Sequence, residues 1–390
     1  MAPLYTRPFF LLCAGHFMAA LGIIASVLLP IRLDWLGASR TEIGFTLSLM
    51  ALGGLVSRPL VGWALDAWGR KPVICLGIAF CVVGIVALGF IDALGVSLYL
   101  TQLFWGVGVG AFFTGIFTFA SDHIPEEHRT RGMAFFGVFG LLPLGLYGVI
   151  ETLHVRADEL HVVFWAIGSL IGTSFFFVVP IPELHVRAAR SASTVGASSG
   201  RLGEFFRALF SREMTSVWIA DVVFATMFAV FLAFVAVTAS AQGMASPGNI
   251  WLVYALFALG VRTVGGSLMQ RVGPDRIVLP ALLLYVVAIV LCGVGRSPGV
   301  FLVAGAFAGA GHGYAFPVLA SLVVSRAEES VRGAAFAFYT GLWDFSLFAS
   351  RPVGGWAADR WGDQAMYGCV AAFVSVGLVL FVFAERRRAR

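Results

Sequence analysis

Long apolar runs occupy most of this 390-residue chain and set the first limit on its fold. An α-helix needs about 20 mostly apolar residues to cross a bilayer. Charged residues make up only 12% of the chain, whereas a soluble domain carries about 25%. The sequence therefore predicts an all-α membrane protein of twelve spanning helices, at residues 8–30, 42–64, 72–91, 97–121, 131–150, 161–181, 214–240, 249–269, 276–295, 299–325, 332–355 and 364–384.

The distribution of Lys and Arg predicts the orientation of these helices. With the N-terminus placed inside, most of the 26 basic residues fall in the inner loops and the C-terminal tail. The outer loops hold only Arg32, Arg40, Arg156, Arg296 and Arg360. Cytoplasmic loops carry such an excess of basic residues. We therefore expect a plasma (inner) membrane protein with both termini in the cytoplasm, and we assign the net charge of +5 to topology and not to a nucleic-acid partner.

The longest loop divides the chain into two halves. Its SASTVGASSG segment has the composition of a flexible linker. In the RLGEFFRALF segment that follows, the apolar residues fall on one helical face, which is typical of a helix lying on a membrane surface. The sequence thus predicts a six-helix bundle at residues 1–181, a cytoplasmic linker at 182–213 and a second six-helix bundle at 214–390.

A thirteen-residue segment, the repeated motif, occurs twice in the chain. SRPLVGWALDAWG begins at Ser57 and SRPVGGWAADRWG begins at Ser350. A weaker copy keeps Arg262, Gly266 and Gly273. The two strong copies align without a gap and are identical at Ser57/Ser350, Arg58/Arg351, Pro59/Pro352, Gly62/Gly355, Trp63/Trp356, Ala64/Ala357, Asp66/Asp359, Trp68/Trp361 and Gly69/Gly362.

The positions of the repeats indicate internal duplication. In the predicted topology, the two strong copies lie on helices 2 and 11, which run in opposite directions. RGMAFFGVFG at Arg131 and RGAAFAFYTG at Arg332 align on helices that run in the same direction. Two pseudo-symmetric halves with nested inverted three-helix repeats are typical of secondary transporters.

These residues carry a resemblance to a known family. The chain resembles the major facilitator superfamily over essentially its whole length. The loop between helices 2 and 3 of that family reads Gly-x-x-x-Asp-Arg-x-Gly-Arg-Arg/Lys, and this chain has GWALDAWGRK, with Ala67 in place of the first Arg. The resemblance implies a cytoplasmic gate in which Asp66 meets the N-terminal end of helix 11; the gate residues are then Gly62, Asp66, Gly69, Arg70, Arg332 and Gly333.

The chain also departs from the family pattern. Gln102 stands where many proton-driven exporters of the family carry Arg in helix 4, and residues 140–145 alter the spacing of a Gly-Pro signature in helix 5. In the loop between helices 8 and 9, Gln270 replaces the motif Asp. The first two departures weaken the expectation of export by proton exchange without removing it.

Ionisable residues inside the predicted spans are candidates for function, because a charge at the bilayer centre costs about 2.5–3.5 kcal/mol on an insertion scale. Asp344, Asp221, His16 and His312 are the candidates for proton coupling, with Asp344 first. The alternative for each is a structural hydrogen bond or ion pair. Asp344 and Arg351 lie two turns apart, too far for a direct pair.

Substrate candidates come from the motif arginines and from aromatic residues. Arg58, Arg262 and Arg351 belong to the repeated motif, so a fold or gating role is favoured for them over substrate binding, with their stems reaching toward the membrane interface. The resemblance implies that helices 1, 4, 7 and 10 line a central cavity. The aromatic candidates on these helices are Phe113, Phe117, Phe224, Phe228, Tyr314 and Phe316.

The composition favours an amphipathic solute over a sugar, because Asn and Gln are scarce while the chain has 36 Phe and 10 Trp. The sequence predicts a secondary active transporter that exports a small amphipathic organic solute by proton-coupled alternating access. The alternatives left open are an exporter of organic anions or metal chelators, a lipid flippase and a non-transporting receptor. The sequence has no pattern of a catalytic, cofactor or metal site, so we expect a non-enzymatic monomer whose partners are solute, protons and bilayer.

Overall fold

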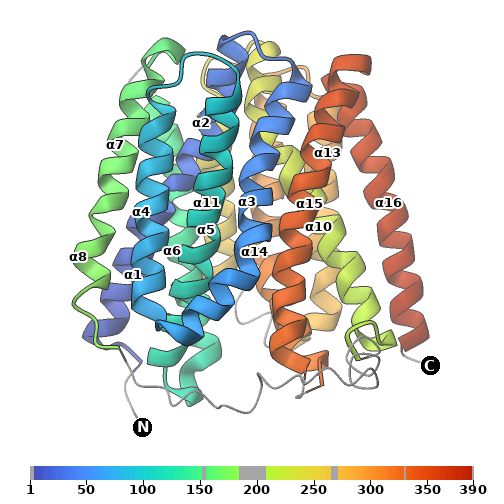
Figure 1. The fold of residues 1–390 in the computed structure, drawn as a ribbon. Coiled ribbons are helices and arrows are strands. Elements are labelled where there is room, and N and C mark those ends of the chain that lie inside the picture. Colours follow the sequence, from blue (N-terminus) through green and yellow to red (C-terminus); the bar gives the residue numbers. More distant parts are fainter. Residues whose placement is uncertain (1–3, 152–154, 184–207, 265–270, 329–330, 389–390) are drawn as a thin grey trace.

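The computed structural model describes residues 4–151, 155–183, 208–264, 271–328 and 331–388. These residues form helices and no strands. The helices stand side by side around a common axis, and α1 begins at the same end of the bundle at which α16 ends (Figure 1). We call this the terminal end and the opposite one the distal end.

The helices before the 184–207 gap form the N-terminal half. They are α1 (Arg7–Ala20), α2 (Gly22–Trp35), α3 (Arg40–Ala67), α4 (Arg70–Leu88), α5 (Val96–His123), α6 (Arg129–Glu151), α7 (Leu160–Gly172) and α8 (Ser174–Val178), with short 3-10 turns at Glu126–His128 and Ala157–Glu159. The helices after the gap form the C-terminal half. They are α10 (Arg212–Ala241), α11 (Gly248–Val264), α13 (Pro274–Val294), α14 (Pro298–Arg326), α15 (Arg332–Trp361) and α16 (Asp363–Arg388).

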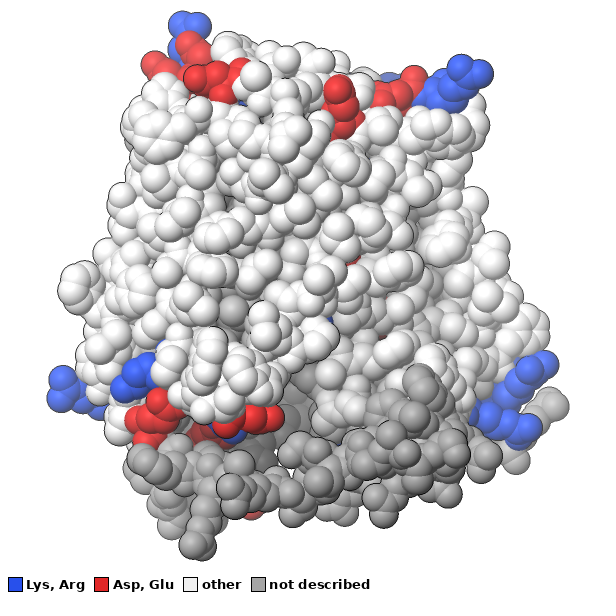
Figure 2. All heavy atoms as spheres, in the orientation of Figure 1, with Lys and Arg blue, Asp and Glu red and all other residues white. Residues whose placement is uncertain are grey.

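The described helices confirm the twelve predicted spans. The pairs α1–α2 and α7–α8 each form one continuous span, and every other helix is a span by itself. Within the described residues, nine of the spans are long and apolar enough to cross a membrane, as judged by length and composition alone. Figure 2 shows Lys, Arg, Asp and Glu gathered at the two ends of the bundle, with an almost uncharged surface between them. This band suits the hydrocarbon core of a bilayer, about 30 Å thick.

Part of the predicted linker and part of the weaker motif copy lie outside the described residues. Most of the expected surface helix falls within 184–207, and Gly266 and Gln270 fall within 265–270. The division into two bundles joined by a cytoplasmic linker therefore stays a prediction.

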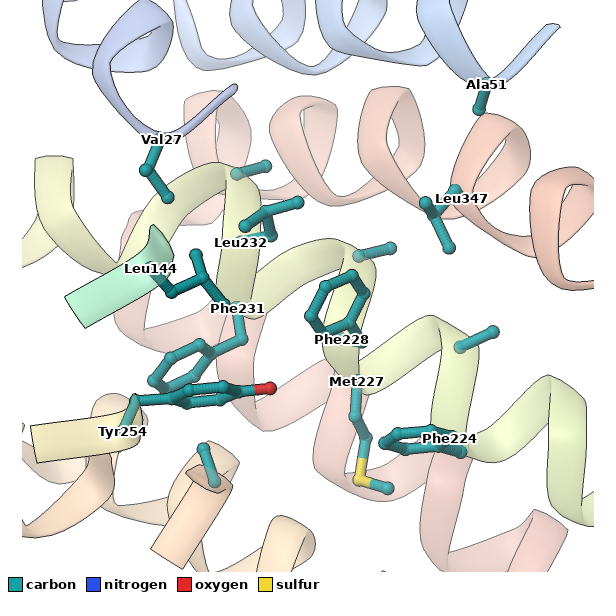
Figure 3. Packing of buried hydrophobic residues seen from close by; sticks show 14 of the residues in the cluster. Val27, Ala51, Leu144, Phe224, Met227, Phe228, Phe231, Leu232, Tyr254 and Leu347 are labelled. Carbon is teal, nitrogen blue, oxygen red and sulfur yellow. The ribbon is translucent and has the colours of Figure 1, made fainter. Parts of the chain in front are cut away.

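Three pairs of helices make most of the contact between the described parts of the two halves. α3 packs on α15, α6 packs on α11, and α2 packs on α10. Helix α10 is the most buried candidate span, and its inner side chains pack along its length against neighbouring helices (Figure 3). The labelled residues of this core on α10 are Phe224, Met227, Phe228, Phe231 and Leu232.

The repeated motif ends α3 and α15 in the same way. Gly69 and Gly362 have φ angles of 93° and 87°, a conformation that favours glycine and reverses the chain after each helix. The two motif tryptophans before each glycine are exposed and pack edge to face, with centroids 5.4 Å apart for Trp63 and Trp68. The equivalent pair, Trp356 and Trp361, is 5.1 Å apart. Exposed Trp is typical of membrane interfaces.

Close backbone contact holds α3 against α5. A Cβ atom on Gly106 would overlap the carbonyl of Met50, and one on Gly53 would overlap the carbonyl of Leu103. Small residues allow such approach between membrane helices, where van der Waals packing supplies much of the association energy.

We expect Gly106→Ala to destabilise the protein by about 1–3 kcal/mol, because backbone atoms of α3 must move to admit the methyl group. Gly260→Ala is the matched control. No atom outside the local helix backbone lies within 4 Å of a Cβ at position 260. Replacing a helical glycine with alanine stabilises the folded state by about 0.5–1 kcal/mol, so this variant should not be destabilised. Thermal unfolding midpoints of the purified variants in one detergent measure the difference. Equal midpoints would contradict the packing argument.

Candidate functional site

An ion pair joins the two halves inside the membrane-spanning region. Arg58 on α3 donates from Nε and Nη2 to Oδ2 of Asp344 on α15, at 2.9 and 2.6 Å. Its Nη1 also donates to the hydroxyl of Thr340 at 2.9 Å. Asp344 lies twelve residues after Arg332, about 18 Å along α15. Opposite charges thus neutralise each other near the middle of the span, where either one alone is costly.

This geometry corrects the expectation for Arg58. Its side chain was expected to reach toward the membrane interface, but Asp344 holds the guanidinium inside the bundle, and the two side chains are only 23% and 16% exposed. Sequence reasoning missed the pair because the residues are 286 positions apart. One signal was present, since the strong copies of the repeated motif lie on the two helices that meet.

The other motif arginines reach main-chain carbonyls. Arg351 is buried, and its Nη1 donates to the carbonyl of Leu47 on α3 at 2.6 Å. It forms no ion pair with Asp344 in the described structure, as their spacing predicts. Arg262 on α11 donates to the carbonyls of Gly137 and Gly313, at 3.2 and 3.4 Å. All three arginines therefore bond to a neighbouring helix.

Asp221 and Tyr339 are buried polar groups that lack partners. Asp221 on α10 is fully buried, and neither carboxylate oxygen has a hydrogen-bond partner among the described residues. The Tyr339 hydroxyl on α15 is also buried and has no hydrogen-bond partner among the described residues. Burying a carboxylate without a partner is costly, so this position suits a group that binds a proton or a small polar ligand.

An aromatic cluster surrounds His312 in the C-terminal half. The Tyr254 hydroxyl is hydrogen-bonded to His312 Nδ1. The rings of Phe224 and Phe228 both lie 5.2 Å from that imidazole, and Phe316 lies 6.0 Å away. Figure 3 shows Phe224 and Phe228 on α10, one turn apart. The structure thus brings together four of the predicted residues; Tyr314 is half-buried on α14 and has no ring contact among the described residues.

A second aromatic cluster surrounds His16 in the N-terminal half. His16 on α1 is fully buried and its Nδ1 lies 3.2 Å from the Phe136 carbonyl. Its ring stacks on Phe136 at 4.4 Å, with Phe117 and Phe113 at 5.3 and 5.8 Å. The candidates Phe113, Phe117 and His16 therefore meet. Phe136 was missed because a single phenylalanine among 36 carries no sequence signal.

The gate residues lie apart at the terminal end. Asp66 is exposed and has no hydrogen bond or ion pair with any described residue. Arg332 and Gly333 are exposed at the start of α15, and no atom lies within 4 Å of a Cβ on Gly333. The expected contact between Asp66 and this helix end is not formed here. Arg70 instead donates to Asp122 at 3.0 Å.

The other copy of the motif is engaged at the distal end. Asp359 accepts hydrogen bonds from the backbone N–H groups of Arg40 and Thr41, each at 2.8 Å, and from the Thr41 hydroxyl at 2.5 Å. The Arg40 side chain bonds Asp363 at 3.2 Å and Asp34. The distal ends of α3 and α15 are therefore joined while their terminal-end counterparts are separate.

The fold and these paired halves define a class: an integral membrane protein with the helical architecture of a transporter. Sequence comparison agrees, since the profile of the Major Facilitator Superfamily matches residues 10–348 and 243–390. The chain belongs to this superfamily of transporters.

Individual relatives support the same assignment. The chain is 25% identical over 363 residues to the uncharacterized MFS-type transporter YhhS of Escherichia coli strain K12, which covers 89% of this chain and 84% of that protein. Its fold is similar to that of the nucleoside transporter NupG, with a TM-score of 0.74, 12% identity and coverage of 98% and 99%. A POT family transporter in complex with a thioalcohol-conjugated peptide gives a TM-score of 0.79 at 13% identity, with coverage of 98% and 96%.

The Arg58–Asp344 pair can be tested by a double-mutant cycle of Arg58→Gln and Asp344→Asn. We expect the double variant to be less destabilised than the sum of the two single variants, with a coupling free energy of about 1–2 kcal/mol. Thermal unfolding in lipid nanodiscs measures it. The Arg156–Asp158 pair, with side chains 75% and 41% exposed, is the control and should couple by about 0–1 kcal/mol. Equal coupling at the two sites would contradict a structural role for the interior pair.

Proposed function

We propose that the protein is a secondary active transporter that exports a small amphipathic organic solute across the plasma (inner) membrane in exchange for protons. The observation that carries the proposal is the ion pair between Arg58 and Asp344. It joins the two halves at the depth at which transporters of this architecture place substrate and coupling-ion sites. A proton on Asp344 would cancel one charge of the pair and weaken the contact between the halves.

Alternating access supplies the rest of the mechanism. The distal ends of α3 and α15 are held together by Asp359, while Asp66 and the start of α15 are separate at the terminal end. This conformation is expected to give access from the terminal end. With both termini in the cytoplasm, a solute would enter from the cytoplasm and leave at the distal end after the halves rock.

The aromatic clusters support the proposed class of solute. Each half holds a buried histidine enclosed by phenylalanine rings, His16 in one and His312 in the other. Such surroundings favour the apolar body of an amphipathic molecule, and few polar groups are available to fix a sugar. The Tyr339 ring lies 6.4 Å from Phe316 of the His312 cluster, and Asp221 and Tyr339 are buried polar groups without hydrogen-bond partners among the described residues.

Proton-coupled transport is tested with purified protein in liposomes that hold a pH-sensitive dye. A proton gradient is imposed across the liposome membrane, and a panel of lipophilic cations, neutral amphiphiles and organic anions is then added. We expect solute-dependent proton flux in the wild type and its loss in Asp344→Asn, which keeps the size of the side chain but cannot carry the charge. The variant should still insert and stay monodisperse.

Asp158→Asn is the matched control, because Asp158 pairs with Arg156 at the surface, with side chains 41% and 75% accessible. It should transport as the wild type does. Proton flux at the wild-type rate in Asp344→Asn would refute the role of Asp344. Absence of flux with every solute, from correctly folded wild-type protein, would refute proton-coupled transport of this class of solute.

A further inference from the structure

The two strong copies of the repeated motif occupy opposite ends of one helix pair. Helices α3 and α15 lie against each other and run in opposite directions (Figure 1). Gly62 and Asp66 of the first copy are therefore at the terminal end. Gly355 and Asp359 of the second copy are at the distal end. The same motif residues thus occupy both ends of the α3–α15 pair, in two different surroundings.

At the distal end, α3 depends on the other half for its N-terminal hydrogen bonds. The first N–H groups of a helix have no partner within it. The Ser39 hydroxyl, just before α3, accepts a hydrogen bond from the N–H of Glu42 at 3.2 Å, and the Glu42 carboxylate accepts one from the N–H of Ser39 at 2.8 Å. The N–H groups of Arg40 and Thr41 donate to Asp359. A carboxylate at this position is also favoured by the helix dipole.

Gly355 brings the two backbones into contact beside this carboxylate. A Cβ atom at this position would overlap the carbonyl of Arg40 and come within 2.8 Å of the Thr41 Cα. No side chain at position 355 could be admitted without separating α3 from α15. The motif glycine and the motif aspartate therefore act on the same two residues of the N-terminal half.

At the terminal end, the same two motif positions have no partner. No atom lies within 4 Å of a Cβ on Gly62, and Asp66 is exposed without a hydrogen bond to the described residues. Val331, which precedes α15, provides no side-chain hydrogen bond to the helix. The start of α15 thus lacks, among the described residues, the capping carboxylate that the start of α3 receives.

We propose that Asp359 and Gly355 form a distal latch, which closes the distal end of the transporter and alternates with the contact expected between Asp66 and the start of α15. The proposal rests on the proposed alternating access. The Arg58–Asp344 pair joins α3 and α15 between their two ends, so a tilt about this point brings one pair of ends together and separates the other. One motif copy is engaged in each state.

Distances between spin labels at the two ends test the latch in the full-length protein. In a background without the native cysteines, one label pair at Ala93 and Ser297 reports the distal end. A second pair at Glu126 and Arg387 reports the terminal end. All four positions are exposed, and each label pair has one position in the N-terminal half and one in the C-terminal half. Double electron–electron resonance in lipid nanodiscs gives the fraction of molecules open at each end.

The motif itself provides matched variants. Asp359→Asn should raise the ratio of distal-open to distal-closed molecules about tenfold, as expected for loss of charge-assisted hydrogen bonds, and Thr41→Val should raise it about twofold. Gly355→Ala should also open the distal end. Asp66→Asn and Gly62→Ala carry the same substitutions in the other copy and should shift the population the opposite way. Asp158→Asn, whose ion pair stays within the N-terminal half, should change nothing.

The outcomes separate the latch from the transport mechanism. Opposite shifts by the two sets of variants would support the latch. If both ends open and close in the wild type but Asp359→Asn, Thr41→Val and Gly355→Ala leave the distal distances unchanged, the latch is refuted and alternating access stands. If neither end moves in any variant or under a proton gradient with the solute panel, alternating access is refuted and the latch with it.

Discussion

Charge neutralisation inside the bilayer is the constraint on which the arrangement of α3 and α15 depends. Arg58 and Asp344 come from different halves, and each satisfies the other in a region where an unpaired charge is costly. The pair requires α3 and α15 to pack closely, and glycines allow this: a Cβ on Gly44 would overlap the Arg351 carbonyl. The Arg58–Asp344 pair joins the two halves inside the membrane and leaves the ends of α3 and α15 unconstrained by it. Such an arrangement permits the halves to rock while the interior pair stays formed.

Two of the interfaces between the halves are related by pseudo-symmetry but differ in chemistry. The alignment of Arg131 with Arg332 places Pro143 of α6 at the position equivalent to Asp344 of α15. Arg262, the counterpart of Arg58, accordingly meets the carbonyls of Gly137 and Gly313. A carbonyl holds a guanidinium by its dipole alone, and a proton cannot remove that dipole. Of these two arginine contacts, the one between α3 and α15 is therefore the one that protonation of its acceptor can weaken.

The spans and their order could be predicted from sequence because hydrophobic length is a local property that one chain displays. The internal repeat also predicted which helices are related. The partner of Arg58, the engaged state of Asp359 and the rings around His16 could not be predicted. Each depends on which helix faces fit together across hundreds of residues, and in a chain with 46 glycines and 36 phenylalanines many faces look alike. The repeat marked Asp359 and Asp66 as equivalent, but the three-dimensional structure was needed to show that Asp359 is bonded while Asp66 has no partner among the described residues.

The tryptophan pairs that close each motif copy give the helix pair a fixed relation to the bilayer. Trp63 and Trp68 sit at the terminal end, and Trp356 and Trp361 sit at the distal end, all of them exposed. Indole rings favour the headgroup level, so the length of α3 and α15 between the two pairs sets a preferred hydrocarbon thickness. Because helices respond to a thickness mismatch by tilting, the lipid composition of the membrane would act on the same tilt that the proposed latch requires between α3 and α15. In the proposed alternating access, bilayer thickness would thereby act on the balance between the two access states.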